Sequence, residues 1–434
     1  MLNSDFIYGV ATASFQIEGG VENRLPCIWD TFCATEGKII DKSNGDVACD
    51  HFNQWQKDVE LIESIGVDAY RLSISWPRVI NADGQVNEQG MAFYINILDA
   101  LQRKGIKAFV TLYHWDLPQH LEDDGGWLNR ATAYKFQQYV AHVVKAFGDK
   151  VFAYATLNEP FCSAYLGYEI GVHAPGLKNK NFGKKAAHHL LLAHGLAMQV
   201  LSSLSPKTKN GIVLNFTPAY AATNSAEDIA ATAYANDYFN QWYARPILDG
   251  QYPDIINQMP IEQRPDIDEH DMAIIAHPIG FLGVNFYTRM VYQHHEQQGF
   301  AEVRLDSVQR TDMDWEIYPQ AFTSLLTDLH QRYSLPPIYI TENGAAMKDQ
   351  LINGEVNDID RIDYYQRHLT AVDNAIEMGV NVKGYFAWSL MDNFEWAEGY
   401  LKRFGIVHVD YKTQTRTVKA SGLAYKKLIA ERIK

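Results

Sequence analysis

Two glutamates, Glu159 and Glu342, each stand directly after an apolar run, where a buried strand would give way to a loop. Glu159 lies in NEP at 158–160, which follows VFAYATL at 151–157. Glu342 lies in TENG at 341–344, which follows IYI at 338–340. If the two strands face each other, the sequence predicts a pair of carboxyl groups across one pocket, the arrangement that cleavage of a glycosidic bond requires.

A carboxyl pair suits this chemistry because its two members can do opposite work. The oxygen of a glycosidic bond leaves readily only when it is protonated, so one carboxylic acid must hold its proton near neutral pH. The second carboxylate, about 5–5.5 Å away in enzymes that retain the anomeric configuration, attacks the opposite face of the sugar. Its charge raises the pKa of the acid, and that pKa falls once the charge is lost in a covalent intermediate. Either segment alone is compatible with an ordinary turn.

The elements that would position these glutamates form a repeating pattern of short apolar runs and longer amphipathic stretches, which favours parallel strands joined by helices. We predict strands at residues 8–13, 69–73, 108–113, 153–157, 211–215, 282–285, 338–341 and 384–388. We predict helices at residues 92–104, 131–147, 186–203, 227–248, 318–333, 360–378 and 419–431. No Pro/Ser-rich linker divides the chain. The pattern therefore predicts an α/β fold with one catalytic domain, residues 1–434, built as a (β/α)8 TIM barrel.

Side chains unsuited to a core follow nearly every predicted strand. They are Gln16, Arg71, His114, Trp115, Asn158, Asn215, Asn285, Tyr287, Trp388, Glu395 and Trp396. The carboxyl ends of the strands carry the active site in this fold, so these groups should converge with the two glutamates. Each alone could be a hydrogen-bonded core group, above all Asn285 and Arg71. Their recurrence at strand ends favours a pocket.

Composition limits the partners of the chain. Lys and Arg number 38 against 52 Asp and Glu, for a formal net charge of −14. Such a chain repels nucleic acid and anionic membrane surfaces. Aromatic residues make up 12% of the sequence, with 9 Trp and 25 Tyr, and aromatic faces stack on the apolar side of sugar rings. We expect a small-molecule partner, neither nucleic acid nor a membrane, and no cofactor.

The cysteines raise the question of a zinc site near His51. They are Cys27, Cys33, Cys49 and Cys162. Their spacing matches no usual zinc pattern, so we expect reduced thiols and no metal. Cys162, three residues after Glu159, is interpreted as a small buried hydrophobe that lines the pocket entrance together with Tyr165. His188, His189 and His194 fall on one predicted helix and are interpreted as structural.

Targeting signals are not evident in the sequence. No basic segment followed by an apolar one occurs at the N-terminus, and no run of about 18 apolar residues occurs elsewhere. We therefore expect a cytoplasmic protein. Assembly into a homo-oligomer is compatible with the sequence and is not specified by it.

Several further segments resemble those of glycoside hydrolase family 1, and the resemblance runs from Phe6 to about Leu428. Besides NEP and TENG, they are YGVATAS at 8–14, QIEG at 16–19, YRLSISWPR at 70–78, LYHWDLP at 112–118, WSLMDNFEW at 388–396 and RFG at 403–405. The resemblance implies a retaining β-glucosidase that hydrolyses terminal β-D-glucosyl residues from β-glucosides and short cello-oligosaccharides. It also implies that Glu159 is the acid/base and Glu342 the nucleophile.

The same resemblance implies roles for the pocket residues. Those expected to hydrogen-bond the sugar hydroxyls are Gln16, His114, Asn158, Glu395 and Trp396. Arg71 and Tyr287 are expected beside the nucleophile, where an Arg supports the ionised carboxylate and a Tyr hydroxyl orients it. Trp388 is expected beneath the sugar ring and Trp315 beside the leaving group. The remaining substrate-binding candidates are Trp115, Asn285 and Phe404.

Glu395 bears on the choice of sugar. In the phospho-β-glycosidases of the family, the corresponding region lacks this carboxylate and binds a phosphate, whereas FEW at 394–396 is intact here. A carboxylate aimed at the 4- and 6-hydroxyls would repel a 6-phosphate, which favours unphosphorylated glucose, with galactose or fucose tolerated. Glu159 argues against the myrosinase branch, in which Gln replaces the acid/base.

Three alternatives stay open. The first is an enzyme of the same fold that prefers β-galactosides or β-fucosides. The second is a catalytically silent sugar-binding barrel, which the presence of both glutamates disfavours. The third is a metal-dependent barrel hydrolase, which would need His and Asp clustered at the strand ends, where the sequence offers only His114.

Overall fold

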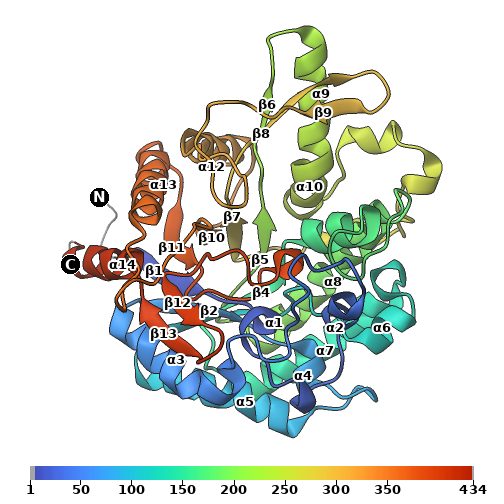
Figure 1. Cartoon of the computed structure of the whole chain (residues 1–434). Coiled ribbons are helices and arrows are strands. Elements are labelled where there is room, and N and C mark those ends of the chain that lie inside the picture. Colours follow the sequence, from blue (N-terminus) through green and yellow to red (C-terminus); the bar gives the residue numbers. More distant parts are fainter. Residues whose placement is uncertain (1–4, 433–434) are drawn as a thin grey trace.

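The computed structural model describes residues 5–432. Eight parallel strands close into a barrel, in which β1 pairs with both β2 and β11 (Figure 1). They are β1 (Ile7–Ala11), β2 (Ala69–Ser73), β3 (Lys107–Thr111), β4 (Ala153–Asn158), β5 (Lys209–Asn215), β7 (Phe281–Asn285), β10 (Ile338–Asn343) and β11 (Val382–Trp388). Each predicted strand corresponds to one of these, with ends displaced by at most two residues. The predicted (β/α)8 TIM barrel is confirmed.

Helices surround the barrel and cap its ends. They are α1 (Ser14–Ile17), α2 (Ile28–Ala34), α3 (His51–Ile65), α4 (Trp76–Val79), α5 (Glu88–Arg103), α6 (Gln119–Asp123), α7 (Ala131–Phe147), α8 (Gly183–Leu204), α9 (Ala226–Asn236), α10 (Trp242–Leu248), α11 (Asp271–Ile275), α12 (Gln320–Arg332), α13 (Ile359–Glu377) and α14 (Ala420–Glu431). None of the helices among residues 5–432 is long and apolar enough to cross a membrane.

The packing of α7 shows how the sequence pattern produces this ring. Phe136, Tyr139, Val140, Val143 and Val144 are buried, and their spacing of three and four residues places them on one helical face. Gly148, with a φ of 58°, follows the helix and lets the chain turn toward β4. The barrel strands read instead as nearly continuous buried runs, because one face meets the helices and the other fills the barrel.

One predicted helix is wrong in its continuity. Residues 227–248 comprise α9, a π-helical segment at Asp237–Gln241, and α10, which contains Pro246. A π-helical turn changes the hydrogen-bonding register while the chain keeps its helical course, so hydrophobic periodicity does not reveal it.

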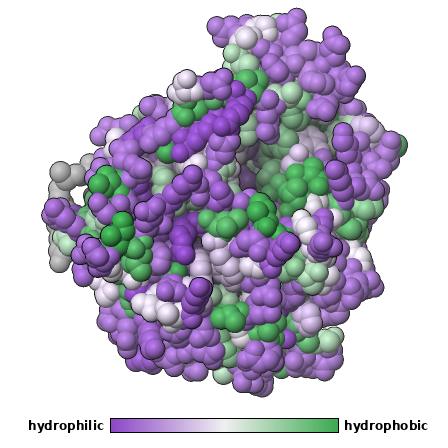
Figure 2. Space-filling model, viewed as in Figure 1, coloured by the Kyte–Doolittle hydropathy of each residue, from purple (hydrophilic) through white to green (hydrophobic). Residues whose placement is uncertain are grey.

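A small sheet extends from the carboxyl ends of β5 and β7 and was not predicted. It contains β6 (Ala219–Ala221), β8 (Met290–His295) and β9 (Gly299–Glu302), and α9 packs against it (Figure 1). Beside it, the surface is hollowed and apolar residues border the hollow (Figure 2). A hairpin of β12 (Val407–Asp410) and β13 (Thr415–Val418) follows the loop after β11.

Candidate active site

The carboxyl ends of the strands surround a cavity of about 380 Å³ that contains both glutamates. Glu159 directly follows β4, and Glu342 lies within β10; β5 and β7 separate these strands in the barrel. The predicted site residues that line the cavity are His114, Trp115, Glu159, Asn285, Tyr287, Trp315, Glu342, Trp388, Glu395, Trp396 and Phe404. Gln16, Arg71 and Asn158 lie behind this lining and contact it through hydrogen bonds.

A continuous set of hydrogen bonds joins the two glutamates. Arg71 donates from Nη1 to Glu342 Oε1 at 2.6 Å and from Nη2 to Asn158 Oδ1 at 2.7 Å. Asn285 donates from Nδ2 to the same Asn158 oxygen at 3.1 Å and to Glu159 Oε1 at 2.7 Å. Asn158 therefore couples the position of one carboxyl group to that of the other.

Glu342 is held at both carboxylate oxygens. Tyr287 donates its hydroxyl to Oε2 at 2.6 Å, while Arg71 contacts Oε1. Burial raises the pKa of Tyr287 well above its usual range, as does the charge of Glu342, so the phenol keeps its proton and remains a donor. Gly344 allows the end of β10 to approach β11, because a Cβ there would lie 1.7 Å from the carbonyl oxygen of Trp388. Both donors to Glu342 are thus arranged to favour a fixed anion.

Glu159 has a different environment. Its partners are the neutral Asn285 amide on Oε1 and the Cys162 thiol, with Sγ at 3.2 Å from Oε2. Burial raises the pKa of Glu159 to about 8, and the negative charge of Glu342 adds to the shift, while Asn285, Cys162 and Arg71 partly oppose it. The geometry thus supplies one carboxyl group that holds a proton near neutral pH and one that faces a cation.

Two buried polar atoms without a partner lie beside Trp388, Trp396 and Glu395 of the cavity lining. Asn158 donates from Nδ2 to His114 Nε2 at 3.1 Å, which leaves the proton of the neutral imidazole on Nδ1. Burial lowers the pKa of His114 well below its usual value, so the ring stays neutral. His114 Nδ1 and Gln16 Oε1 have no hydrogen-bond partner among the described residues. One is a donor and the other an acceptor, which together suit a hydroxyl group.

The wall of the cavity that Trp388 and Trp396 form is aromatic. The His114 ring stacks on Trp388 with a centroid distance of 5.8 Å and on Trp396 at 6.0 Å, each at an interplanar angle of 15°. Trp115 packs on Trp396 at 4.5 Å and donates from Nε1 to the Asn158 carbonyl at 2.8 Å. These contacts fix the rings in one orientation before any ligand binds.

Glu395 is the third carboxyl group of the cavity. Burial raises its pKa to about 8, and the charges of Glu342, Glu398 and Glu159 add to the shift. Gln16 donates from Nε2 to Glu395 Oε2 at 3.4 Å and to the Phe394 carbonyl at 2.8 Å. Among the described residues that line the cavity, none is Lys or Arg. An anionic ligand would therefore meet carboxyl groups and no cation at the surface.

The opposite side of the cavity mixes predicted and unpredicted residues. Trp315 packs against Tyr287 at 5.3 Å and against Phe404 at 6.0 Å. His173 also lines the cavity and was not predicted, because its segment, GVHAPG at 171–176, carries turn signals and no catalytic motif. Tyr165 does not belong to the lining, contrary to expectation, because it packs outward against Phe239 at 5.2 Å.

Three non-glycine residues of the site adopt left-handed backbone conformations. The φ angles are 80° for Trp115, 46° for Glu159 and 50° for Trp396. Such conformations cost on the order of 1 kcal/mol or more each and persist where the surrounding structure enforces them. Strained conformations of this kind are common among residues of active sites.

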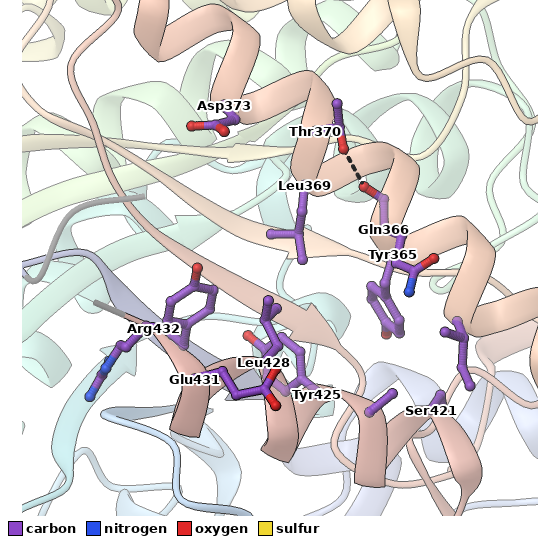
Figure 3. Close-up of a pocket in the computed structure, with 13 residues that line it drawn as sticks. Tyr365, Gln366, Leu369, Thr370, Asp373, Ser421, Tyr425, Leu428, Glu431 and Arg432 are labelled. Atoms are coloured by element: carbon purple, nitrogen blue, oxygen red, sulfur yellow. Dashed lines mark hydrogen bonds between the residues drawn. The ribbon is translucent and has the colours of Figure 1, made fainter. Parts of the chain in front are cut away.

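A second cavity, of about 440 Å³, lies between α13 and α14, beside β1 (Figure 3). Tyr365, Leu369 and Tyr425 contribute to its wall, and its carboxylates, Asp373 and Glu431, come from different helices. Tyr8, in the first half of β1, places this cavity toward the amino ends of the strands. None of the predicted site residues lines it.

Residues 5–432 contain no group of three or more His, Cys, Asp or Glu side chains that could hold a metal ion, and the four cysteines are free thiols. His188 contacts Asp271 through Nε2 at 2.8 Å, and His194 contacts Thr156 through Nδ1 at 2.7 Å. These two histidines are thus engaged within the protein.

Comparisons with known proteins identify the family of the chain. The family model described as glycosyl hydrolase family 1 matches residues 1–433. A β-glucosidase of Agrobacterium sp. is 45% identical over 98% of this chain and 94% of its own, and a bifunctional β-D-glucosidase/β-D-fucosidase of Bifidobacterium breve is 41% identical over 98% and 97%. The crystal structure of a β-glucosidase from Exiguobacterium antarcticum superimposes with a TM-score of 0.95 at 43% identity, covering 99% of this chain and 98% of that one. Because the family model spans nearly the whole chain, the chain belongs to glycosyl hydrolase family 1.

Proposed function

We propose that this protein is a retaining β-glucosidase that releases terminal β-D-glucosyl residues from β-glucosides and short cello-oligosaccharides. Glu159 is the acid/base and Glu342 the nucleophile. The observation that carries the proposal is the unequal environment of two linked carboxyl groups. One faces a guanidinium and a phenol at both oxygens, and the other has only neutral partners and a raised pKa.

The reaction takes place in two displacements. In the first, the Glu342 carboxylate bonds to the anomeric carbon as the bond to the leaving oxygen breaks, and the Glu159 proton passes to that oxygen. Loss of the Glu342 charge then lowers the pKa of Glu159. In the second, ionised Glu159 takes a proton from water, the water oxygen bonds to the anomeric carbon, and Glu342 leaves as a carboxylate. Two inversions retain the configuration.

The glycone fits the wall that Trp388 and Trp396 form. Trp388 is the platform under the ring, and His114 Nδ1 with Gln16 Oε1 offers a donor and an acceptor to a hydroxyl. The other groups proposed to bind hydroxyls are Asn158, Glu395 and Trp396. Those proposed to shape the rest of the substrate site are Trp115, Asn285, Tyr287, Trp315 and Phe404, with Arg71 in support of the nucleophile.

The lack of a cation among the described lining residues favours an unphosphorylated glycone. The lining contains Glu395 and Glu398 beside the catalytic pair, and none of its described members is Lys or Arg. A sugar phosphate would therefore lose its hydration without gaining a counter-charge. A second candidate, β-fucosidase activity, is favoured by the similarity to the bifunctional Bifidobacterium enzyme.

The test of the proposal is a set of four p-nitrophenyl β-glycosides: glucoside, galactoside, fucoside and 6-phosphoglucoside. We expect turnover of the glucoside, weaker or comparable turnover of the fucoside and galactoside, and none of the phosphorylated sugar. Hydrolysis of the phosphorylated sugar alone would overturn the role of Glu395. Binding of glucosides without turnover of any of the four would identify a silent sugar-binding barrel. Activity that is lost with a strong chelator and restored by a divalent metal would favour a metal-dependent hydrolase.

We expect kcat/KM for the glucoside to fall as pH rises through the raised pKa of Glu159, about 8, because the acid must be protonated when the substrate arrives. The pKa of Glu395 is raised to the same range, so the experiment must show which of the two glutamates causes the fall of kcat/KM. We call this fall of kcat/KM at high pH the basic limb of the profile. E395Q should keep the basic limb. E159Q should lose it when it is assayed with a 2,4-dinitrophenyl glucoside, whose leaving group departs without protonation. The reverse pattern would assign the limb to Glu395.

Tyr287→Phe is expected to lower kcat by about 10- to 100-fold, because it removes a hydrogen bond to a charged oxygen of Glu342. The matched control is Tyr165→Phe, since Tyr165 lies on the π-helical segment Cys162–Glu169 and makes no contact with Glu342. Steady-state kinetics of the two variants decide the point. Equal losses in both would mean that the phenol of Tyr287 acts only through packing.

Some predictions from the sequence stay predictions. They are the single catalytic domain over residues 1–434, the cytoplasmic location and the lack of a nucleic-acid partner.

A further inference from the structure

Among the cysteines within residues 5–432, Cys162 is the one whose thiol contacts a proposed catalytic group. Its Sγ lies 3.2 Å from Glu159 Oε2, and its backbone N–H donates to the Glu159 carbonyl at 2.9 Å. The residue is 7% exposed and lines the cavity. It begins the π-helical segment Cys162–Glu169, so the thiol and the acid are fixed within one turn of chain.

The two oxygens of Glu159 are not equivalent. At Oε1 the Asn285 amide N–H can only donate, whereas the Cys162 thiol at Oε2 can either donate or accept. The proton of the acid therefore belongs on Oε2, the oxygen that faces Cys162. Oε2 is thus the atom that must give a proton in the first displacement and take one in the second.

We propose that Cys162 is a positioning residue that holds Glu159 Oε2 in place in both of its protonation states. A thiol can donate to the carboxylate, and it can accept from the carboxylic acid. Both interactions are weak, so Oε2 leaves the sulfur easily for the leaving oxygen or for water. The inference rests on the proposed acid/base role of Glu159.

The chemistry of the thiol supports this role over that of a nucleophile. Burial raises the pKa of Cys162 well above its usual value, and the charges of Glu159, Glu342 and Glu395 raise it further. The sulfur therefore stays protonated, and the thiolate needed for attack on the anomeric carbon does not form. A thiol that stays protonated can act in the pocket as a hydrogen-bonding group alone.

Other charged or titratable groups also face Glu159. They are Glu342 from β10, Arg71 from β2, Tyr287 after β7, His114 after β3 and Glu395 after β11. No hydrogen bond joins any of these five to Oε2 in the described part of the chain. All five are unchanged by a substitution at position 162. A difference between variants at that position therefore reports on the sulfur contact.

The test compares the basic limb of the kcat/KM profile in C162S and C162A, with C33S and C33A as matched controls away from the cavity. A serine hydroxyl is a stronger donor to the carboxylate than a thiol, so the limb should move to lower pH in C162S. Alanine removes the donor, so the limb should move to higher pH in C162A. Each shift should be on the order of half a unit. The Cys33 variants should keep the wild-type limb.

Opposite shifts would support the proposal, because a loss of packing alone would not change sign with the donor strength of the side chain. Unmoved limbs, or shifts in the same direction, would overturn it. Circular dichroism and melting curves establish that each variant is folded. If C162S does not fold, the test uses C162A alone. A basic limb that stays at the wild-type pH in C162A would contradict the proposed role of the sulfur contact. If the wild type hydrolyses glucosides and E159Q loses the limb while both Cys162 variants keep it, only the role of Cys162 fails. If the wild type hydrolyses no glycoside, the proposed function fails first.

Discussion

Replacement of Glu342 by alanine is expected to lower the turnover of aryl β-glucosides by roughly 10⁴- to 10⁶-fold while the barrel stays folded. The loss is large because no other carboxylate can form the covalent intermediate from this position. Arg71 and Tyr287, which donate to the two oxygens of Glu342, would then lose the carboxylate that they hold. The fold should survive, since Glu342 lies at the carboxyl end of its strand, but the loss of the buried ion pair with Arg71 should lower the free energy of unfolding.

The measurement is single-turnover and steady-state kinetics of E342A with and without sodium azide. Azide can enter the space of the missing side chain and attack the anomeric carbon once, so rescue should yield the inverted α-glucosyl azide. The control is E377Q, which changes an exposed glutamate at the end of α13, outside the cavity lining, and should stay within about threefold of wild type. Full activity of E342A would disprove its assignment as nucleophile.

Glu159→Gln should give a smaller loss that depends on the leaving group. For an alkyl glucoside, which needs protonation, we expect kcat/KM to fall by about 10²- to 10⁴-fold. For a 2,4-dinitrophenyl glucoside the same constant should change by less than about tenfold, because this leaving group departs as an anion. The amide keeps the size of the carboxyl group, so its contacts with Asn285 and Cys162 are changed little in shape.

A plot of kcat/KM against the pKa of the leaving group separates the two glutamates. E159Q should show a steep slope, whereas E342A should be slow with every substrate. Azide added to E159A should speed the second displacement and yield the β-glucosyl azide, with configuration retained. If E159Q slowed all substrates equally, Glu159 would be a structural group and the acid would have to be found elsewhere among the lining residues.

Much of the architecture could be predicted from local patterns. The eight barrel strands correspond to runs such as 338–341, which begins with three apolar residues and is buried on both faces. The helix at 131–147 was predicted at its observed bounds, Ala131–Phe147, because its apolar positions recur every three or four residues. Prediction was wrong for 227–248, where a π-helical segment interrupts the helix, and β6, β8 and β9 were not predicted. Strands as short as β6, with three residues, carry too little periodicity to be recognised.

The sequence by itself determined which residues stand at the strand ends, and therefore that Glu159 and Glu342 would share the mouth of one barrel. This was possible because strand ends are marked by local changes from apolar to polar residues. Only the tertiary structure decided the partners of each carboxyl group: Arg71 reaches Glu342 across 271 positions of chain, and Asn285 reaches Glu159 across 126. It also decided that the Cys162 thiol faces Glu159 Oε2 and that Glu395 has a raised pKa. The physical reason is that hydrogen bonds and pKa shifts depend on distance and burial in space, which local sequence patterns do not specify.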